Sequence, residues 1–423
     1  MNAFIVSLVG TTIGLHSQLV SQAGPADAIL YRAILVTPGG ELPFGLEISR
    51  SETGQFRAWV INGEERIEVP SFSVADRQAT FAFPHYESEI CAKLQLDNPN
   101  VEFKACKSMV GTWTKSTRDG SKIAMPFHCE TARDTRFKPV TPGPEGTSAA
   151  KSVDGKWRVK FSSSEDHAIG VFKQTSRGVV DGTFLTNGGD YRYLAGSYEH
   201  GLLRLSCFDG SHAFLFHARM QVDGTLKGDF WSGAKWHETW TAVRDESAQL
   251  ADGFSLAKWK GKADFSAMKF KDLDGIDTAV QSAVDGGKAV LIEVFGSWCP
   301  NCHDASAYLV ELDRKYRSRG LRILGLAFEY SGRFERDATQ VKHFAKRHGV
   351  TYPLFVAGKA DKAEAAAKLP MLERVPAYPS FVFARPDGTI VAVYSGFCGP
   401  ATGEEYEKLK RRFEREIESL LGF

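Results

Sequence analysis

One short motif constrains this chain more than any other feature: two cysteines separated by two residues, just after a continuous apolar run. The run is AVLIEVF, residues 289–295, and the motif is WCPNC, residues 298–302. A continuous apolar run predicts a strand that is buried on both faces, as in a parallel sheet covered by helices. We predict a helix at 300–319, because proline is favoured at a first helical position, where no N–H is needed. A Cys-x-x-Cys pair at such a junction is typical of a redox centre.

The spacing of the two cysteines has a chemical meaning. Cys299 is expected at the start of the helix, where unpaired backbone N–H groups and the helix dipole favour a thiolate and lower its pKa. Cys302 follows one turn later on the same face, so it can attack a mixed disulfide formed at Cys299. The alternative is zinc, but zinc needs four ligands; a second Cys pair is missing, and His303 with His343 or His348 lacks finger spacing. We therefore predict thiol–disulfide exchange and no metal.

The residues around the motif predict alternating strands and helices. We expect a second buried strand at 321–329, a helix at 338–349, a hairpin at 380–396 and an amphipathic C-terminal helix at 403–422. This order is a βαβ unit, an intervening helix, then a hairpin and a helix. It predicts an α/β domain over residues 263–423.

Three stretches of this domain resemble a known family. They are 290–312, which contains the motif, 375–391 (VPAYPSFVFARPDGTIV) and 396–409 (GFCGPATGEEYEKL). They are similar to the TlpA-like thiol–disulfide oxidoreductases, exported members of the thioredoxin superfamily. The resemblance implies a thioredoxin fold for the C-terminal domain, with disulfide exchange as its activity. It does not extend to the N-terminal region.

The resemblance also implies roles for single residues. Pro379, after Tyr378, matches the cis-proline that lies against the active-site disulfide; the alternative is an ordinary trans proline. The Tyr378 backbone is then expected to pair with an incoming extended chain. Glu293 matches the buried acidic position of thioredoxin. A carboxylate buried in an apolar strand has a raised pKa and can accept the proton of Cys302.

Further residues near the motif are candidates for substrate binding or accessory roles. Trp298 is expected to cover the disulfide and, with Pro300 and Asn301, to form the substrate-facing surface. Glu329 ends the second buried strand, so it either approaches the cysteines at the carboxyl edge of the sheet or lies in solvent. Cys398 replaces the Ser or Asn that is usual in the family. It is either a passive thiol or one that forms mixed species near the active site.

The N-terminal region reads as β-structure in two parts. Short strands separated by Gly, Asn and Asp predict β-rich domains, sandwiches or small barrels, at 29–132 and 154–245. Proline- and glycine-rich residues 133–153 and polar residues 246–262 predict linkers. The fold class is therefore multidomain: a β-rich N-terminal region followed by an α/β thioredoxin-fold domain.

The two β-rich parts resemble each other weakly, which favours a duplication but is also compatible with two unrelated meanders. Both contain an Asn-Gly turn, at Asn62 and Asn187, and later a Gly-x-aromatic strand, at Gly111 and Gly228. Asn-Gly is a strong hairpin signal, because both residues tolerate positive φ. No residue here merits a catalytic assignment. The strand histidines are interpreted as packing residues; they are His212, His217 and His237.

Composition narrows the class and location of the protein. Net charge is +1, with 43% hydrophobic and 24% charged residues, which is typical of soluble globular proteins and gives no basic stripe for nucleic acid. The apolar first residues predict a signal peptide at 1–23, hence export to the periplasm or cell envelope, although basic residues are lacking there. No later stretch has the ~18 apolar residues of a membrane span. The pairing of four scattered cysteines stays open: Cys91, Cys106, Cys129 and Cys207.

The predicted activity is reduction of protein disulfides, with electrons supplied by another thiol protein. No nucleotide-binding fingerprint for NAD or flavin is found, so the redox-active Cys299–Cys302 disulfide is the only redox group that we expect. The direction of exchange depends on a reduction potential that the sequence does not supply. Two alternatives remain: a partner- or ligand-binding protein that uses the β-rich region, with the C-terminal domain as docking platform, and a thiol peroxidase.

Overall fold

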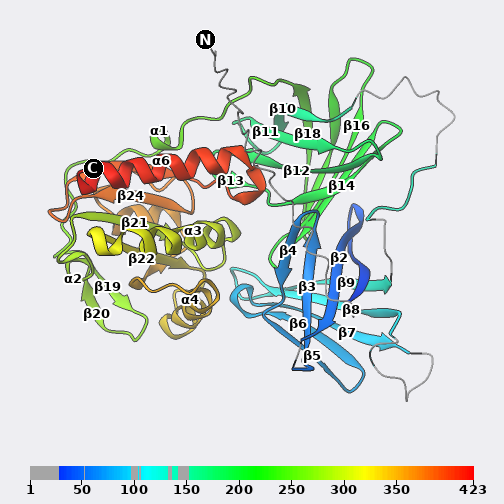
Figure 1. Ribbon diagram of the computed structural model, residues 1–423, viewed down its shortest axis with the longest axis horizontal. Helices are drawn as coiled ribbons and strands as arrows, with labels where there is room; N and C mark the ends of the chain where they lie inside the picture. The colour runs from blue at the N-terminus through cyan, green and yellow to red at the C-terminus, as the bar shows by residue number, and fades with distance from the viewer. Residues whose placement is uncertain (1–27, 52, 97–102, 104–105, 132–135, 142–151) are drawn as a thin grey trace, which may run out of the picture.

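Figure 1 shows the computed structural model, in which two β-sheets precede an α/β domain. The structure describes residues 28–51, 53–96, 103, 106–131, 136–141 and 152–423. The predicted signal peptide, residues 1–23, lies outside the described residues, as do most residues of the predicted linker 133–153. Within the described part, no helix is long and apolar enough to cross a membrane. The β-rich region followed by an α/β domain is the architecture expected from the sequence.

The first nine strands form one antiparallel sheet that curls into an open half-barrel. Its strand order is β4-β3-β2-β1-β9-β8-β7-β6-β5, so the first and last strands pair near its centre. Buried and exposed side chains alternate along β6 and β7, as expected of strands with one face on a core. A short 3-10 helix, η1 (Pro84–Tyr86), joins these two strands. The strands are β1 (Ile29–Thr37), β2 (Gly40–Arg50), β3 (Phe56–Asn62), β4 (Glu65–Glu68), β5 (Ser71–Ala75), β6 (Gln78–Phe83), β7 (Ser88–Gln95), β8 (Ser108–Ser116) and β9 (Lys122–Thr131).

The next nine strands form a closed barrel. β12 pairs with both β11 and β14, which joins the two ends of the meander, and it also pairs with the short strand β13. Aromatic side chains fill the interior; rings of Phe216 and Phe230 stack with centroids 4.2 Å apart. The strands are β10 (Gly155–Phe161), β11 (Ala168–Gln174), β12 (Val179–Thr186), β13 (Gly189–Asp190), β14 (Leu194–Glu199), β15 (Leu202–Phe208), β16 (Ala213–Met220), β17 (Leu226–Ser232) and β18 (Trp236–Arg244).

Every strand pairing of the half-barrel recurs between the equivalent strands of the barrel, and the barrel adds the β12–β14 pairing that closes it. In each, the first strand pairs with the last, and the third strand turns at an Asn-Gly pair into the fourth. Gly111 and Gly228 occupy equivalent strands, β8 and β17. At both glycines a Cβ atom would collide with the backbone of the neighbouring strand, at 1.9 and 1.8 Å respectively. This shared order supports the predicted duplication.

The half-barrel and the barrel also share part of one core. Phe208 at the end of β15 packs into the half-barrel, where its ring lies 4.6 Å from that of Phe44. The Asn62 amide donates to the carbonyl of Phe208 at 2.8 Å, so the Asn-Gly turn of the half-barrel is tied to the barrel. Buried contacts of this kind fix the two units against each other.

The α/β domain is built on a seven-stranded sheet of order β20-β19-β23-β22-β21-β24-β25. The run 289–295 is β21, an interior strand between β22 and β24, and all its residues are buried. β21, β22 and β23 are parallel, and β24 and β25 form the predicted antiparallel hairpin. The strands are β19 (Lys269–Asp272), β20 (Asp277–Ala279), β21 (Ala289–Phe295), β22 (Leu321–Glu329), β23 (Leu354–Lys359), β24 (Ser380–Ala384) and β25 (Ile390–Ser395).

Helices cover both faces of this sheet. Side chains of α3, α4 and α6 pack on one face, and those of α2 and α5 pack on the other. α6 matches its expected bounds within one residue, and α4 ends as expected but begins four residues earlier, at Phe334. The elements α2, α5, β19, β20 and β23 were not expected. The helices are α1 (Gly253–Leu256), α2 (Val280–Val284), α3 (Pro300–Tyr316), α4 (Phe334–His348), α5 (Lys362–Lys368) and α6 (Glu404–Leu421), with 3-10 helices η3 (Arg317–Arg319) and η4 (Pro400–Thr402).

The segment 246–262, expected to be a linker, takes part in this packing. It contains α1, and the Phe254 ring packs against the rings of Tyr394 and Phe413, with centroid distances of 4.9 and 6.5 Å. One aromatic residue therefore fastens the connecting segment to the sheet and to α6. The polar composition of the segment concealed this role.

A buried arginine joins the three units of the structure. Arg192, which follows β13 in the barrel, is 8% exposed. Its guanidinium pairs with Glu65 of the half-barrel at 2.8 Å and with Asp304 of α3, and it lies 3.8 Å from Asp209. Removing one partner of a buried ion network leaves uncompensated charge in the interior.

We therefore predict that Arg192→Met lowers the free energy of unfolding by about 3–5 kcal/mol. The matched control is Arg158→Met, because Arg158 pairs with Asp245 on the surface and its side chain is 51% exposed. Breaking that exposed pair should change the stability by less than about 1 kcal/mol. Urea unfolding of the three proteins measures both effects. Equal losses for the two variants would contradict the role of Arg192 at the interface.

Candidate redox site

The turn after β21 delivers Cys299 to the start of α3. Cys299 is the N-cap residue, with extended backbone, and Pro300 is the first helical residue. The Cys299 carbonyl accepts hydrogen bonds from the N–H groups of Cys302, at 2.9 Å, and His303, at 3.2 Å. Cys302 thus lies one turn into the helix, as the spacing predicts.

The two sulfurs have unequal surroundings. Cys299 is 9% exposed, whereas Cys302 is fully buried, and both are free thiols. A hydrogen bond from the Cys302 thiol lowers the pKa of Cys299, and the N–H groups of Cys302 and Asn301 add to this effect against the influence of burial. Burial raises the pKa of Cys302 well above its ordinary value. The pair can therefore present one accessible thiolate and one protonated thiol.

Glu293 is a buried carboxyl group on the same face of β21 as α3. It is 0% exposed, and its only hydrogen-bond donor among the described residues is Ser306, whose hydroxyl lies 2.8 and 3.1 Å from the two carboxylate oxygens. Burial raises the pKa of Glu293 to about 8. The same carboxyl group contributes to the raised pKa of Cys302. A group with a pKa of this size can exchange protons near neutral pH.

The loop before β24 closes the site from another side. The peptide bond between Tyr378 and Pro379 is cis, as the resemblance implies. The Cys299 thiol lies 3.6 Å from the carbonyl oxygen of Tyr378 and donates to it. The backbone of Tyr378 is thus within reach of a group bound at Cys299.

An aromatic cluster lies beside the motif. Trp298 stacks on Tyr330, with ring centroids 4.6 Å apart, and its indole N–H donates to the carbonyl of Phe328 at 2.9 Å. The guanidinium of Arg118, from the turn between β8 and β9, lies 5.2 Å from the ring of Trp298 and 4.8 Å from that of Tyr330. Sequence reasoning missed Arg118 and Tyr330, because no local pattern links the half-barrel to the motif.

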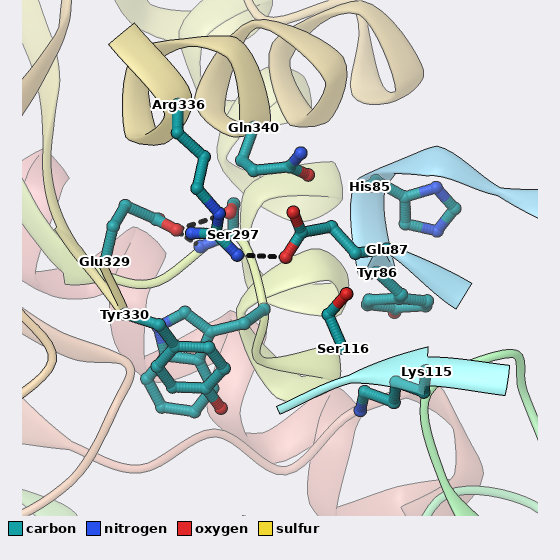
Figure 2. A pocket seen from close by; sticks show the side chains of 11 residues that line it. His85, Tyr86, Glu87, Lys115, Ser116, Ser297, Glu329, Tyr330, Arg336 and Gln340 are labelled. Atoms are coloured by element: carbon teal, nitrogen blue, oxygen red, sulfur yellow. Dashed lines mark hydrogen bonds and ion pairs between the residues drawn. The ribbon is translucent and has the colours of Figure 1, made fainter. Parts of the chain in front are cut away.

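Glu329 lies beneath the turn that carries the motif and not in solvent. It is 2% exposed, and its two oxygens accept from the N–H and the hydroxyl of Ser297 at 2.7 and 2.8 Å. Burial raises the pKa of Glu329 to about 8. In Figure 2, Glu329 and Ser297 face the pair formed by Arg336 of α4 and Glu87 of the half-barrel. The cavity left between these elements measures about 20 Å³, so this interface is close-packed.

A histidine cluster lies behind Cys302. His303 Nε2 is 2.8 Å from the Ser297 carbonyl, which can only accept, so His303 Nδ1 accepts from His348 Nε2 at 2.6 Å. The His85 ring of η1 lies 5.1 Å from that of His303. Burial lowers the pKa of His303, His348 and His85, the last two to about 3. Among the described residues, no group of three or more His, Cys, Asp or Glu is placed to hold a metal ion.

The five remaining cysteines form no disulfide. Cys91, Cys106, Cys129 and Cys207 are free thiols. Cys398 lines a separate cavity of about 450 Å³ between the barrel and the α/β domain, and burial raises its pKa to about 12.

A larger cavity opens between the barrel and the motif. We call it the barrel-mouth cavity; its volume is about 530 Å³. Cys299, Pro300 and Asn301 line one side, and residues from one end of the barrel, including His212 and Trp236, line the other. His212 also packs as expected, since its ring stacks on that of Phe214 at 4.4 Å. Its place opposite the cysteines could not be read from the sequence.

Comparison with known proteins assigns this part of the chain to a family. The sequence model of the Redoxin family matches residues 260–408. These residues form a Redoxin domain. The thiol–disulfide oxidoreductase ResA of Bacillus thuringiensis (strain Al Hakam) is 29% identical over 109 residues, which are 25% of this chain and 58% of ResA. The thioredoxin-like protein YneN of Bacillus subtilis is 26% identical over 133 residues, 31% of this chain and 68% of YneN.

The resemblance to TlpA-like oxidoreductases is thus confirmed for the Redoxin domain, while the chain spans little more than half the length of ResA. Solved structures show similar coverage. A thioredoxin-family thiol:disulfide interchange protein from Chlorobium tepidum TLS has a TM-score of 0.28 and 20% sequence identity. The match covers 36% of this chain and 92% of the Chlorobium chain. A DsbF homologue from Corynebacterium diphtheriae has a TM-score of 0.30 and 17% sequence identity. The match covers 38% of this chain and 92% of the Corynebacterium chain.

The buried carboxyl group of the Redoxin domain makes stability depend on pH. The pKa of Glu293 is raised from 4.5 to about 8, so the unfolded chain releases this proton first as the pH rises, and the native state loses stability between these two values. Glu293→Gln removes this loss. We expect urea unfolding to show similar stability for the reduced variant and wild type at pH 4.5, and a variant more stable by roughly 3 kcal/mol at pH 8. Glu311→Gln, on the exposed face of α3, is the control and should change neither value. A variant no more stable than wild type at pH 8 would contradict this assignment.

Proposed function

We propose that this protein is a thiol–disulfide oxidoreductase that works as a reductase, with Cys299 as the nucleophile and Cys302 as the resolving thiol. The main support is that the two thiols differ in pKa and exposure. Cys299 has a lowered pKa and is partly exposed, whereas Cys302 is buried and protonated. The match to the Redoxin family supports the same chemistry. The thiolate is the attacking species in disulfide exchange, so the sulfur with the lower pKa attacks first.

The cycle balances in two steps. The Cys299 thiolate attacks one sulfur of the substrate disulfide; a mixed disulfide forms, the substrate S–S bond breaks, and one substrate thiolate leaves and takes up a proton. Cys302 then loses its proton and attacks the Cys299 sulfur, which releases the second substrate thiol. The substrate gains two electrons and the protein becomes the Cys299–Cys302 disulfide. A separate thiol donor returns the protein to the dithiol state.

Two neighbouring groups are assigned supporting roles. Glu293 accepts the proton of Cys302 during resolution, since its pKa of about 8 suits proton transfer near neutral pH. The Tyr378 carbonyl lies 3.6 Å from the Cys299 sulfur and is placed to position a bound chain. Assisted resolution speeds the release of reduced product, and on this kinetic ground we propose a reductase, while the reduction potential sets the equilibrium.

The physiological setting belongs to the same proposal. We propose an extracytoplasmic location, supported by the apolar residues 1–23, and a disulfide-bonded peptide or protein substrate with a thiol protein as donor. The alternative of a binding protein predicts no redox difference when Cys299 is replaced. The thiol peroxidase alternative predicts rapid peroxide consumption.

Exchange with one small disulfide tests the proposal. Reduced wild-type protein mixed with oxidised glutathione should end as the Cys299–Cys302 disulfide, because Cys302 resolves the mixed species. Cys302→Ser should stop at a glutathione adduct on Cys299, and Cys299→Ser should form neither product at a comparable rate. Acid quenching, alkylation and mass spectrometry of the cysteine peptides identify each species. If wild-type protein never joins the two sulfurs, the proposed function is wrong.

A second experiment tests the proton acceptor. Glu293→Gln keeps the shape of the side chain but cannot take the proton of Cys302, so the glutathione adduct on Cys299 should persist about 10²-fold longer than in wild type. The rate of adduct formation should stay close to wild type, since attack by Cys299 precedes this transfer. Rapid quenching over a time course separates the two rates. Unchanged adduct decay would remove Glu293 from the mechanism.

A further inference from the structure

In this chain a turn of the barrel covers the surface around the cysteines. The Asn187-Gly188 turn between β12 and β13 packs against three parts of the Redoxin domain. A Cβ on Gly189 would lie 1.9 Å from the Asn301 amide nitrogen, and a Cβ on Gly396 would lie 2.6 Å from the Asn187 carbonyl oxygen. A Cβ on Gly188 would touch Ala377, next to the Tyr378–Pro379 loop, at 3.8 Å.

Strong contacts hold this turn in place. The Asp190 carboxylate accepts from the backbone N–H of Gly399 at 2.6 Å, and Arg192 pairs with Asp304, two residues after Cys302 in α3. A folded protein cannot reach Cys299 across this side unless these buried contacts break. The barrel-mouth cavity, which Cys299 lines, is an open route to this sulfur.

The barrel-mouth cavity has the size and lining of a small-molecule site. Its volume of about 530 Å³ falls within the range of known ligand pockets. The rings of Phe214, Phe230 and Trp236 supply apolar surface, and Trp236 is 52% exposed at the rim. Such a lining suits the methylene and amide groups that flank the sulfurs of a peptide disulfide.

One cation also faces the cavity. The Lys115 ammonium, which comes from β8 of the half-barrel, donates to the carbonyl and the hydroxyl of Ser211 at 2.9 and 2.8 Å. An ammonium has three donors, so one is left for a ligand. Within the described residues, Lys115 forms no ion pair with a carboxylate of the protein. It is therefore placed to receive the carboxylate of a ligand in the same cavity as Cys299.

We propose that the barrel-mouth cavity is the substrate site and that it takes a low-molecular-weight peptide disulfide bearing a carboxylate, of the glutathione disulfide type, in preference to a disulfide in a folded protein. This inference rests on the proposed function and narrows its substrate class. The Cys299 thiolate attacks one sulfur of this compound, one peptide thiol leaves, and Cys302 releases the other, as in the cycle above.

The test measures oxidation of the reduced, full-length protein in single turnover. Three probes are compared: oxidised glutathione, the neutral bis(2-hydroxyethyl) disulfide, and native insulin as a folded protein. Both small disulfides should form the Cys299–Cys302 bond faster than insulin does at equal disulfide concentration. Lys115→Met should lower the ratio of the glutathione rate to the neutral rate about tenfold, the effect of one charge-assisted hydrogen bond.

A matched pair of variants tests the route itself. Ser232→Phe places a ring in the cavity, and Thr239→Phe places the same ring on the exposed side of the neighbouring strand β18. Ser232→Phe should slow the reaction of both small disulfides, whereas Thr239→Phe should leave both rates unchanged; circular dichroism confirms that each variant is folded.

Insulin reacting as fast as oxidised glutathione, or an unchanged rate ratio in Lys115→Met, would overturn the proposed substrate class. Unchanged small-disulfide rates in Ser232→Phe would overturn the proposed route. In each of these cases the Cys299–Cys302 bond still forms, so the proposed function itself is tested separately.

Discussion

The unequal proton affinity of two neighbouring sulfurs is the constraint on which the rest of this structure depends. Both Cys299 and Cys302 are largely buried, and burial alone would keep both thiols protonated. The start of α3 offsets this for Cys299 only, because the first N–H groups of a helix have no partner within the helix and the sulfur at the N-cap lies next to them. Cys302, already inside the helix, supplies the hydrogen bond that further favours the Cys299 thiolate.

Two buried carboxyl groups support this arrangement from below. Glu293 and Glu329 end up on neighbouring parallel strands, each with a serine as donor and each with a pKa of about 8. Their roles differ because their positions differ. Glu293 lies beneath α3 and contributes to the raised pKa of Cys302, whereas Glu329 holds Ser297 and so fixes the turn that precedes Cys299. A carboxyl group with a pKa of about 8 is only partly ionised near neutral pH. It therefore adds little negative charge beneath the thiolate, and its ionised fraction can still take up a proton.

What the sequence could predict follows from how local each signal is. The motif, the fully buried β21 and the start of α3 depend on a few adjacent residues, and each was identified. The cis-proline was expected only because the resemblance to a known family implied it. The short strand β23 and the helix α5 were not predicted because both are short: β23 has six residues and α5 has seven. The buried residues of both are covered by long-range packing that no local pattern shows. The packing of Phe254, in the segment expected to be a linker, was not predicted because its partners lie far away in the sequence. A position in solvent was one alternative for Glu329. The sequence shows only a Glu at the end of a strand and gives no sign that it binds Ser297.

The contacts between the β-rich region and the Redoxin domain could not be predicted either, because they join residues that are far apart in the sequence. Asn187 was recognised as a hairpin turn, yet nothing local to the turn indicates that its carbonyl meets Gly396, more than two hundred residues later. Arg192 shows the same limit, because its partners come from β4 and from α3, and only the packed fold brings three acidic groups around it. A duplicated barrel on its own would be an ordinary scaffold. Because the second sheet closes into a barrel, an intact barrel end lies opposite Cys299, and the β-rich region and the Redoxin domain together line the barrel-mouth cavity.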